Sequence, residues 1–393
     1  MKSGPDLGRK LRLLYVVEGY TDIRFVTGLA GFSELTMLVP EKQFLESGLG
    51  ERIEQAGVPV TVLRTGGGRL TFQIRSLVRL CRIAARFDVI LSQEMLRGSL
   101  NANIAGRLRG VPVVTYTAMP PIEYFRCRLR RGRIGHLRAL AGELLIRLLM
   151  TINGHLSARS LALGPYLHEI VETYSQRVGP NHYYGVDTDT FRPATSSEKL
   201  ELRRKHGLPV DQPLVFLASR ISHEKDPETA LAACAILRRE GIDLVLLNSS
   251  GGWKEFQALA RREAGPETDS WVLARPAAHP VHEVADYFRA ADVTVQASLE
   301  EGLGLSPLES LACETPVVAT RVGGMARVLP PFAVLVPPRD PRSLAAGIRR
   351  ALEKSADDVA MTRAGREFVS SQWSSELAFS ELEKILSAVT IRR

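Results

Sequence analysis

Short apolar segments alternate with helix-length segments in two separate stretches of the chain, and this alternation constrains the fold more than any other feature. The strand-like segments of the first half are 11–17, 35–39, 58–63, 88–92 and 111–116, with a shorter one at Leu161. Those of the second half are 214–219, 243–248, 271–275, 293–297, 317–320 and 333–336. Apolar strands separated by helical patterns predict parallel sheets covered by helices on both faces. The sequence therefore predicts an α/β protein with two doubly wound domains.

The composition is that of an ordinary soluble globular protein with an excess of positive charge. Apolar residues make up 45% and charged residues 24% of the 393 residues. This content is ample for two buried cores, each in a domain of about 190 residues. The net charge of +8 predicts attraction to polyanions such as nucleic acid, anionic lipid or a phosphorylated substrate.

Cysteine spacing and the N-terminal sequence predict a cytoplasmic protein. The cysteines Cys81, Cys127, Cys234 and Cys313 include no C-x-x-C pair, so we expect reduced thiols and no zinc ribbon. The apolar segment 11–17 is too short for the core of a secretory signal and lacks a cleavage site. No apolar run reaches the roughly 18 residues of a membrane span.

The stretch 296–320 reads as the end of a strand, a glycine-containing acidic turn, a helix and a second strand. Such a unit directs the free amides and the positive dipole end of the helix towards any ligand beyond the strands. Glu301 lies in the turn and Glu309 lies two helical turns later, about 12 Å away along the helix axis. The two carboxylates are therefore placed to hold opposite ends of a nucleotide-sugar. The alternative is that Glu301 is solvated and Glu309 only favours the start of the helix.

Two loops after other strands carry further candidate residues, because ligands bind beyond the carboxyl ends of parallel strands. Arg220 and Lys225 follow the strand 214–219, and Asp226 and Pro227 are suited to cap and begin the next helix. Two cations beside a helix N-terminus predict a diphosphate site, although solvated charges are the alternative. Gly19 follows the first strand, but the G-x-G-x-x-G fingerprint of dehydrogenases is absent.

Residues 301–320 read E-G-x-G-L-x-x-L-E-x-x-A-C-x-x-P-V-V-A-T, which resembles the donor-site signature of the retaining glycosyltransferases of family 4. The spacing of Arg220 and Lys225 is similar to a second element of that family, and 183–193 resembles its interdomain connector. The resemblance implies the GT-B fold, with two Rossmann-like domains facing a cleft and a C-terminal helix that crosses back to the first domain. The domains implied are 1–192, joined by the last helix at about 373–393, and 193–372.

The resemblance also implies roles for individual residues and no cofactor or metal requirement. Arg220 and Lys225 would neutralise the leaving diphosphate, Glu301 would contact the donor sugar, and Glu309 would bind the ribose. The residues then expected to be catalytic are Glu301, Arg220 and Lys225. Those expected to bind the donor are Gly19, Thr117, Asn248, Gly251, Gly302, Leu303, Gly304, Leu305 and Glu309. His279 and His282 lack the companions that a metal site needs.

Five positions depart from the family pattern, and one is Ser219 in place of a glycine before Arg220. The family often has a histidine after the fifth strand, where this chain has Thr115-Tyr116-Thr117, so Thr117 or Tyr116 would have to replace it. The other three are Arg327 in place of a glutamate, Glu314 in place of a glycine and Tyr184 in place of an asparagine. These departures leave the expected fold and donor class unchanged, and they bear on the acceptor and the sugar.

The expected activity is transfer of a hexosyl group from a nucleotide-diphosphate sugar to an acceptor, with retention of anomeric configuration. A lipid-linked or polysaccharide precursor is the acceptor class considered. Two alternatives stay open: a GT-B nucleotide-sugar epimerase, and a non-catalytic protein that binds nucleotide-sugars or polyanions.

The segment 124–147 interrupts the alternation with many arginines and few acids. One interpretation is a solvated basic linker followed by a core helix containing Leu140, Leu144, Leu145, Leu148 and Leu149. A second is an interfacial segment, with Tyr124, Phe125, Leu129, Ile134 and Leu137 interleaved among the arginines, that places a cytoplasmic enzyme peripherally on the anionic inner face of a membrane. Nucleic-acid binding is a third, but no recognised module accompanies the arginines.

Overall fold

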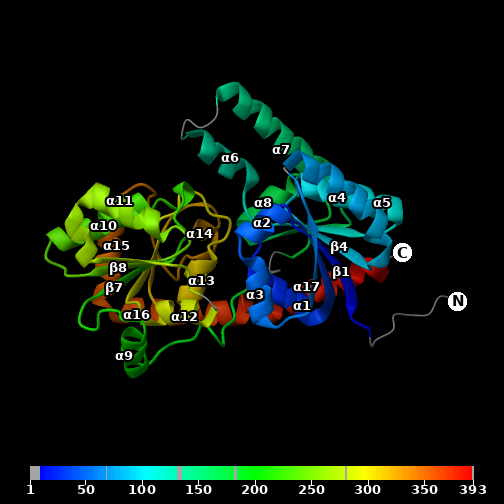
Figure 1. Cartoon of the computed structure of the whole chain (residues 1–393). Coiled ribbons are helices and arrows are strands. Elements are labelled where there is room, and N and C mark those ends of the chain that lie inside the picture. Colours follow the sequence, from blue (N-terminus) through cyan, green and yellow to red (C-terminus); the bar gives the residue numbers. More distant parts are fainter. Residues whose placement is uncertain (1–8, 68, 131–134, 181–183, 279–280, 392–393) are drawn as a thin grey trace. The chain divides into compact units, whose positions relative to one another are not determined.

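Two parallel sheets, each of six strands and each flanked by helices, organise the chain (Figure 1). The structure is a computed structural model, and it describes residues 9–67, 69–130, 135–180, 184–278 and 281–391. The chain divides into two compact units, the first formed by Met1–Tyr184 with Glu376–Arg393 and the second by Gly185–Ser375. The predicted α/β class with two doubly wound sheets is confirmed.

The first unit has the strand order β3-β2-β1-β4-β5-β6, with all neighbours parallel. Its strands are β1 Leu11–Val16, β2 Ser33–Pro40, β3 Val60–Thr65, β4 Val89–Gln93, β5 Val113–Thr117 and β6 Arg159–Ala162. Its helices are α1 Ile23–Phe32, α2 Glu41–Glu46, α3 Leu49–Ala56, α4 Arg69–Ile83, α5 Arg97–Arg109, α6 Pro121–Arg130, α7 His136–Leu156, α8 Pro165–Glu172 and α17 Ser375–Ile391. Asp22 caps α1 by accepting a hydrogen bond from the Arg24 amide at 2.9 Å. The hydroxyl of the preceding residue, Thr21, does not cap the helix and is hydrogen-bonded to the Tyr15 hydroxyl at 2.8 Å.

The second unit repeats this topology as β12-β11-β10-β7-β8-β9. Its strands are β7 Leu214–Leu217, β8 Val245–Ser249, β9 Val272–Arg275, β10 Val293–Gln296, β11 Val317–Thr320 and β12 Val334–Val336. Its main helices are α9 Ser196–Lys205, α10 Pro227–Arg239, α11 Trp253–Ala264, α12 Val281–Ala290, α13 Leu305–Ala312, α14 Gly323–Val328, α15 Pro341–Glu353 and α16 Ala356–Gln372.

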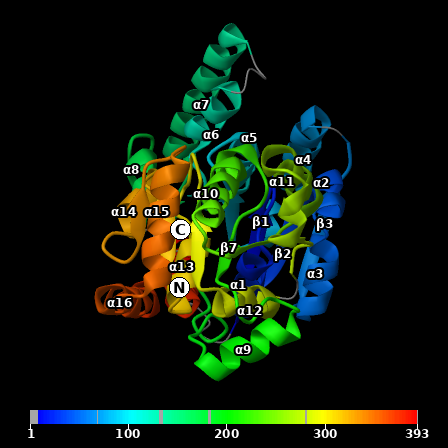
Figure 2. The ribbon, with the colours of Figure 1, turned by 90° about the vertical axis from the view of Figure 1, so that its left-hand side faces the viewer.

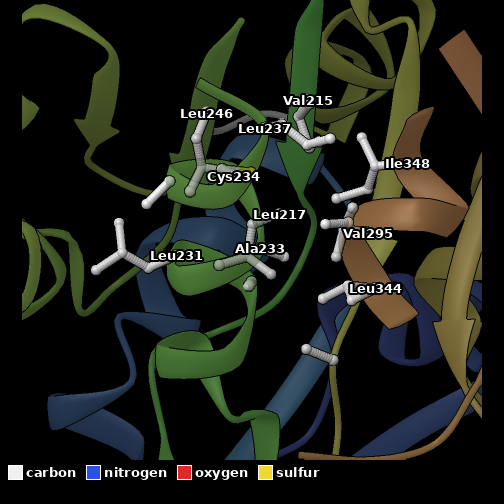
Figure 3. Packing of buried hydrophobic residues seen from close by; sticks show 14 of the residues in the cluster. Val215, Leu217, Leu231, Ala233, Cys234, Leu237, Leu246, Val295, Leu344 and Ile348 are labelled. Atoms are coloured by element: carbon white, nitrogen blue, oxygen red, sulfur yellow. The ribbon is translucent and has the colours of Figure 1, made fainter. Parts of the chain in front are cut away.

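The core of the second unit lies between its sheet and the pair α10 and α15. Figure 3 shows Val215 and Leu246 of the sheet meeting Leu237 of α10, with Leu344 and Ile348 of α15 beside them. All five side chains are buried. Because burying one such side chain contributes about 1.5–3 kcal/mol, this cluster gives the loops at the strand ends a rigid base.

The last helix, α17, belongs to the first unit, as the family resemblance implied. Its Phe379 ring lies 6.0 Å from Phe25 of α1, and Gly28 leaves the space that this ring occupies. The chain turns from α16 into α17 at Trp373 and Ser374, close to the expected start of the last helix at about residue 373.

The connector that resembles the family motif is anchored in the second unit. Val186 pairs with Ser374, and Arg366 donates a hydrogen bond to the carbonyl of Phe191 at 2.7 Å. Phe191 is buried against Phe288, with ring centroids 5.8 Å apart. The boundary between the units therefore lies at Tyr184 and not near residue 192, because these contacts hold 185–192 to helices of the second unit.

The expectation of a core helix at α7 is wrong for most of its leucines. Leu140, Leu144, Leu145 and Leu148 are exposed, and only Leu149 of the expected set is buried. The reason is that α7 packs on α5 through its opposite face.

A charged cluster holds α9 to the sheet of the second unit. Asp292, just before β10, accepts hydrogen bonds from Arg203 at 2.6 Å, Lys199 at 2.8 Å and the Leu214 amide at 2.8 Å. Burial raises the pKa of Asp292, but the charges of Lys199 and Arg203 and the hydrogen bonds outweigh burial and leave that pKa well below its ordinary value.

We expect Asp292→Asn to lower the free energy of unfolding by about 3–5 kcal/mol, because Arg203 would remain buried without its counter-charge. The stabilisation from Asp292 is present above its unfolded pKa of about 3.9 and is lost as the pH falls through the lower folded value. Urea unfolding at several pH values measures both effects.

Asp269→Asn is the matched control, because Asp269 pairs with Arg261 at the surface, where both side chains are about half exposed. We expect no measurable loss of stability from it, because exposed ion pairs contribute little. Equal losses for the two variants would contradict the role of Asp292.

Candidate functional site

The candidate site lies where the strand order of the second sheet changes direction, between β7 and β10. These two strands are parallel neighbours, with Val293 opposite Val215. The connections that leave their carboxyl ends run to opposite sides, which leaves a place for a ligand beyond the strand ends. The loop after β7 carries Arg220 and Lys225, and the loop after β10 carries Glu301.

Lys225 and Glu301 meet at this position as an ion pair. Lys225 lies in a short 3-10 turn, His223–Lys225, and its Nζ contacts Oε2 of Glu301. The same carboxylate oxygen accepts hydrogen bonds from Ser298 Oγ at 3.2 Å and Gln296 Nε2 at 3.3 Å. The Lys225 and Glu301 side chains are only 11% and 13% exposed. Two residues that the sequence singled out from distant loops are therefore in direct contact.

Main-chain contacts fix the two loops to each other and to α14. The Leu299 amide donates to the Glu224 carbonyl at 2.7 Å, which joins the loop after β10 to the loop after β7. The Gly324 amide donates to the Glu301 carbonyl at 3.0 Å. A Cβ at position 324 would lie 2.0 Å from the Gly302 carbonyl oxygen, so only glycine permits this approach.

The start of α13 provides backbone amides next to the acidic turn. Gly304 precedes the helix with φ 89, a left-handed conformation that suits glycine, and no side chain caps the helix. Leu305 and Ser306 are partly exposed, whereas Gly302 and Leu303 are buried. The amides at a helix start carry partial positive charge and bind anions.

The neighbouring helix α10 differs, because its N-terminus is already capped. Asp226 accepts hydrogen bonds from the Thr229 hydroxyl at 2.7 Å and the Thr229 amide at 3.4 Å, and Pro227 has no amide hydrogen. The sequence predicted this cap correctly. The first amides of α13, unlike those of α10, therefore stay free of a side-chain cap.

Asn248, expected near the nucleotide, has a buried side chain that is bonded within the protein. Its amide nitrogen donates to the carbonyls of Leu217 at 2.8 Å and Ser219 at 2.9 Å, and its oxygen accepts from Ser250 at 2.7 Å. Asn248 thus shapes the strand end that leads to the exposed Arg220. Gly251, expected nearby, lies with open space above it.

Some buried polar atoms at the site have no hydrogen-bond partner among the described residues. They include Oγ of Ser219, after β7, and Oε1 of Gln296, at the end of β10. Buried polar atoms in folded proteins nearly always have a protein, water or ligand partner. Their position beside the Lys225–Glu301 pair is what a site for a polar ligand requires.

Glu309 and Glu224 complete the acidic groups of this region. Glu309 lies in α13 and is buried, as a residue of the helix face that packs inward. Burial raises the pKa of Glu224, but hydrogen bonds and the charges of Arg220 and Lys225 lower it further, and the net pKa lies below its ordinary value.

In the first unit, Gly19 follows β1, the counterpart of β7, and Thr117 ends β5, the counterpart of β11. Gly19 is exposed after β1. Thr117 is fully buried at the end of β5, and its hydroxyl has no hydrogen-bond partner among the described residues. Tyr116 is instead packed against Phe25 and bonded to the Tyr15 hydroxyl. Of the two residues expected to replace the family histidine, only Thr117 therefore has an uncommitted polar atom.

Glu94 is a residue that the sequence analysis missed. It follows β4 with φ 58, and burial raises its pKa to about 8 although the amides of Ala118 and Met119 hydrogen-bond to it. Its second carboxyl oxygen is buried and unpaired among the described residues. Its position directly after an apolar strand was the only signal in the sequence, and this signal does not distinguish a buried acid from a solvated one.

The described residues contain no group of three or more histidine, cysteine, aspartate or glutamate side chains placed to hold a metal ion. Of the two histidines considered in the sequence, His279 lies outside the described residues, and His282 lies in the first turn of α12.

The family described as "Glycosyl transferases group 1" matches residues 198–368. A curated relative from Catenulispora acidiphila, named D-inositol 3-phosphate glycosyltransferase 1, is 30% identical over 297 residues, covering 72% of this chain and 68% of its own. The chain belongs to this family. A second relative, the D-inositol 3-phosphate glycosyltransferase of Thermobispora bispora, is 32% identical over 71% of this chain and 65% of its own length. The match to the Pseudarthrobacter chlorophenolicus relative spans 34% of that protein's length, with 43% identity.

Solved structures of glycosyltransferases share the GT-B fold with this chain. Anabaena HepE, solved in complex with UDP and glucose, has a TM-score of 0.76 and 14% identity, covering 96% of this chain and 100% of its own. WaaG, a glycosyltransferase involved in lipopolysaccharide biosynthesis, has a TM-score of 0.69 and 14% identity, covering 95% and 99%. At this identity the likeness shows the fold.

One departure from the family-4 pattern has a structural explanation. Glu314, which replaces the usual glycine after α13, adopts φ 53. Glycine adopts this left-handed conformation without strain, whereas other residues adopt it at some cost. The turn into β11 is therefore kept, although the residue type has changed.

We expect Gly324→Ala to lower the free energy of unfolding of the second unit by about 1–3 kcal/mol, because the added methyl group would overlap the Gly302 carbonyl oxygen. The loop containing Glu301 would have to shift to relieve the overlap. Urea unfolding and a crystal structure of the variant measure the two effects.

Gly251→Ala is the control, since no atom lies within 4 Å of a Cβ added there. Its stability should stay within about 0.5 kcal/mol of the unaltered chain. A Gly324→Ala variant as stable as this control would contradict the packing described here.

Proposed function

We propose that the chain is a retaining hexosyltransferase that uses a nucleotide-diphosphate sugar as donor. The observation that carries the proposal is the meeting of Lys225, Glu301 and the uncapped start of α13 at the switch point of the second sheet. The solved complexes of HepE with UDP and with UDP-glucose support a donor of this class.

The proposed chemistry follows from where charge develops when the glycosyl bond breaks. Negative charge grows on the leaving diphosphate, and positive charge grows on the sugar ring. Lys225, Arg220 and the amides of Leu305 and Ser306 would stabilise the diphosphate, and such preorganised groups supply much of an enzyme's rate enhancement. Because these groups already bring positive charge, we propose that transfer needs no divalent metal.

Glu301 has two tasks in this proposal. In the free protein it neutralises Lys225, whose removal from water would otherwise be costly. When the donor binds, the diphosphate would take over part of the interaction with Lys225, and the carboxylate would then accept hydrogen bonds from the sugar hydroxyls. The proposed role of Glu309 in binding the ribose rests on the family resemblance.

Two acceptor classes are proposed for the transfer. The names of the relatives point to a small phosphorylated polyol, since they are D-inositol 3-phosphate glycosyltransferases. The alternative is a lipid-linked or polysaccharide precursor. Incubation with each class and a labelled donor distinguishes them. Donor turnover without any acceptor would instead indicate an epimerase or a hydrolase.

We expect Lys225→Ala to fold but to weaken binding of a nucleoside diphosphate by at least about tenfold, because one charge-assisted contact to the diphosphate is lost. Glu309→Ala should weaken it similarly, whereas Glu301→Ala should reduce turnover more than affinity. Isothermal titration calorimetry with UDP and GDP, followed by donor-turnover assays, measures these effects.

Arg262→Ala is the matched control, because it removes one exposed positive charge from α11 of the same unit. Its affinity should stay within about twofold of the unaltered chain. Unchanged affinity in Lys225→Ala would overturn the assignment of the diphosphate site.

We expect the transferred sugar to keep the anomeric configuration that it has in the donor. A single proton NMR spectrum of the product, compared with that of the donor, measures the configuration through the anomeric coupling. An inverted product would refute the retaining mechanism and leave the donor site unaffected.

A further inference from the structure

Helix α7 presents a continuous row of leucines to solvent. Leu137, Leu140, Leu144, Leu145 and Leu148 are 85%, 61%, 59%, 52% and 56% exposed. At about 100° per residue, the five side chains fall within an arc of about 140° on one side of the helix. We call these five residues the leucine row. Isolated exposed leucines are common, but a contiguous apolar patch marks an interaction surface.

The opposite face of α7 is firmly packed, so the exposure of the leucine row does not result from a loosely attached helix. Ala139, Leu149 and Met150 are buried there. Asn153 is also buried and donates hydrogen bonds to the carbonyls of Leu96 at 3.0 Å and Leu149 at 2.8 Å. Figures 1 and 2 show α6 and α7 as a pair that extends outward from the strands of the first unit.

Helix α6 covers a different part of α7 and leaves the leucine row open. The Phe125 ring occupies the space above Gly142, where an added Cβ would lie 2.4 Å from the ring. The aromatic residues of α6 were expected to face a bilayer, but Phe125 faces α7. The apolar surface available to a partner is therefore on α7.

Positive charge borders the leucine row. On the same helical projection, Arg138 lies at one edge of the arc and Arg147 at the other. Glu143 is paired with both Arg126 and Arg147 at 2.7 Å, so its negative charge is more than compensated. The sequence 123–147 as a whole contains seven arginines and two glutamates.

We propose that α7 docks on an anionic lipid bilayer, with the leucine row in the acyl boundary and the arginines at the headgroups. An apolar stripe bordered by cations is the pattern of interfacial helices. The row extends only about 16 Å along the helix, too short to cross a bilayer. Consistently, none of the described helices is long and apolar enough to span a membrane.

A bilayer fits the leucine row better than a second copy of the chain does. A symmetric dimer through α7 would bring together two segments that each carry a strong excess of arginine. Like charges across an interface oppose association, whereas an anionic surface attracts every one of these arginines. Docking does not depend on the proposed sugar transfer, and the test needs no substrate.

The test is flotation of the full chain with vesicles of phosphatidylcholine alone or with about a third phosphatidylglycerol. We expect the unaltered chain to float with the anionic vesicles and to be largely released by high salt. The Leu144→Glu/Leu148→Glu variant should partition at least about tenfold more weakly, because two inserted side chains become charged.

Ile74→Glu/Leu108→Glu is the matched control, because both residues are 69% exposed, lie on α4 and α5 of the same unit and give the same change in net charge. It should float within about twofold of the unaltered chain. Because all four side chains are exposed, we expect both double variants to fold, and circular dichroism measures this.

Three results would overturn the proposal. The first is equal flotation of the two double variants, and the second is recovery on neutral vesicles equal to that on anionic ones. The third is a dimer of the unaltered chain, detected by light scattering, that the Leu144→Glu/Leu148→Glu variant converts to a monomer. If the unaltered chain does not float with either kind of vesicle but still transfers sugar, membrane docking is rejected and the proposed function stands.

Discussion

The reversal of strand order between β7 and β10 is the constraint on which the candidate site depends. Helical connections leave these adjacent strands towards opposite faces of the sheet, so their carboxyl ends stay uncovered. The loops after the two strands are held together by the bond from the Leu299 amide to the Glu224 carbonyl. Because the loops are fixed in this way, the side chains of Lys225 and Glu301 are held close enough to form an ion pair.

The contact between Lys225 and Glu301 is better understood as preparation for a ligand than as a source of stability. A largely buried ion pair gains little over water, because removing both charges from solvent costs about as much as their attraction returns. Gln296 and Ser298 also donate hydrogen bonds to the Glu301 carboxylate. Glu301 would therefore keep hydrogen-bond donors if Lys225 moved to contact an anion. In the proposed function, this arrangement would hold Lys225 in position to contact the diphosphate of the donor.

The two units share a topology but carry different groups at their switch points. The second unit pairs Lys225 with Glu301 beside the uncapped start of α13, whereas the first pairs Arg97 with Glu18 and buries Glu94. Glu18 accepts hydrogen bonds from Arg97 and the Gly98 amide, and Glu94 is buried with a raised pKa.

The sequence by itself determined the order and type of the elements, since these depend on local patterns. Apolar runs located the twelve strands of the described residues, and the Asp226-Pro227 pair located the start of α10. Lys225 and Glu301 were expected at the site from the family resemblance, and the structure places the two side chains in contact. Only the tertiary structure decided which side chains meet and which stay open. The internal bonding of Asn248, the burial of Glu94 and the outward leucines of α7 depend on neighbours far away in the chain. A local pattern records whether a residue is apolar or charged, but burial and pairing result from packing between distant segments, and no single segment contains that information.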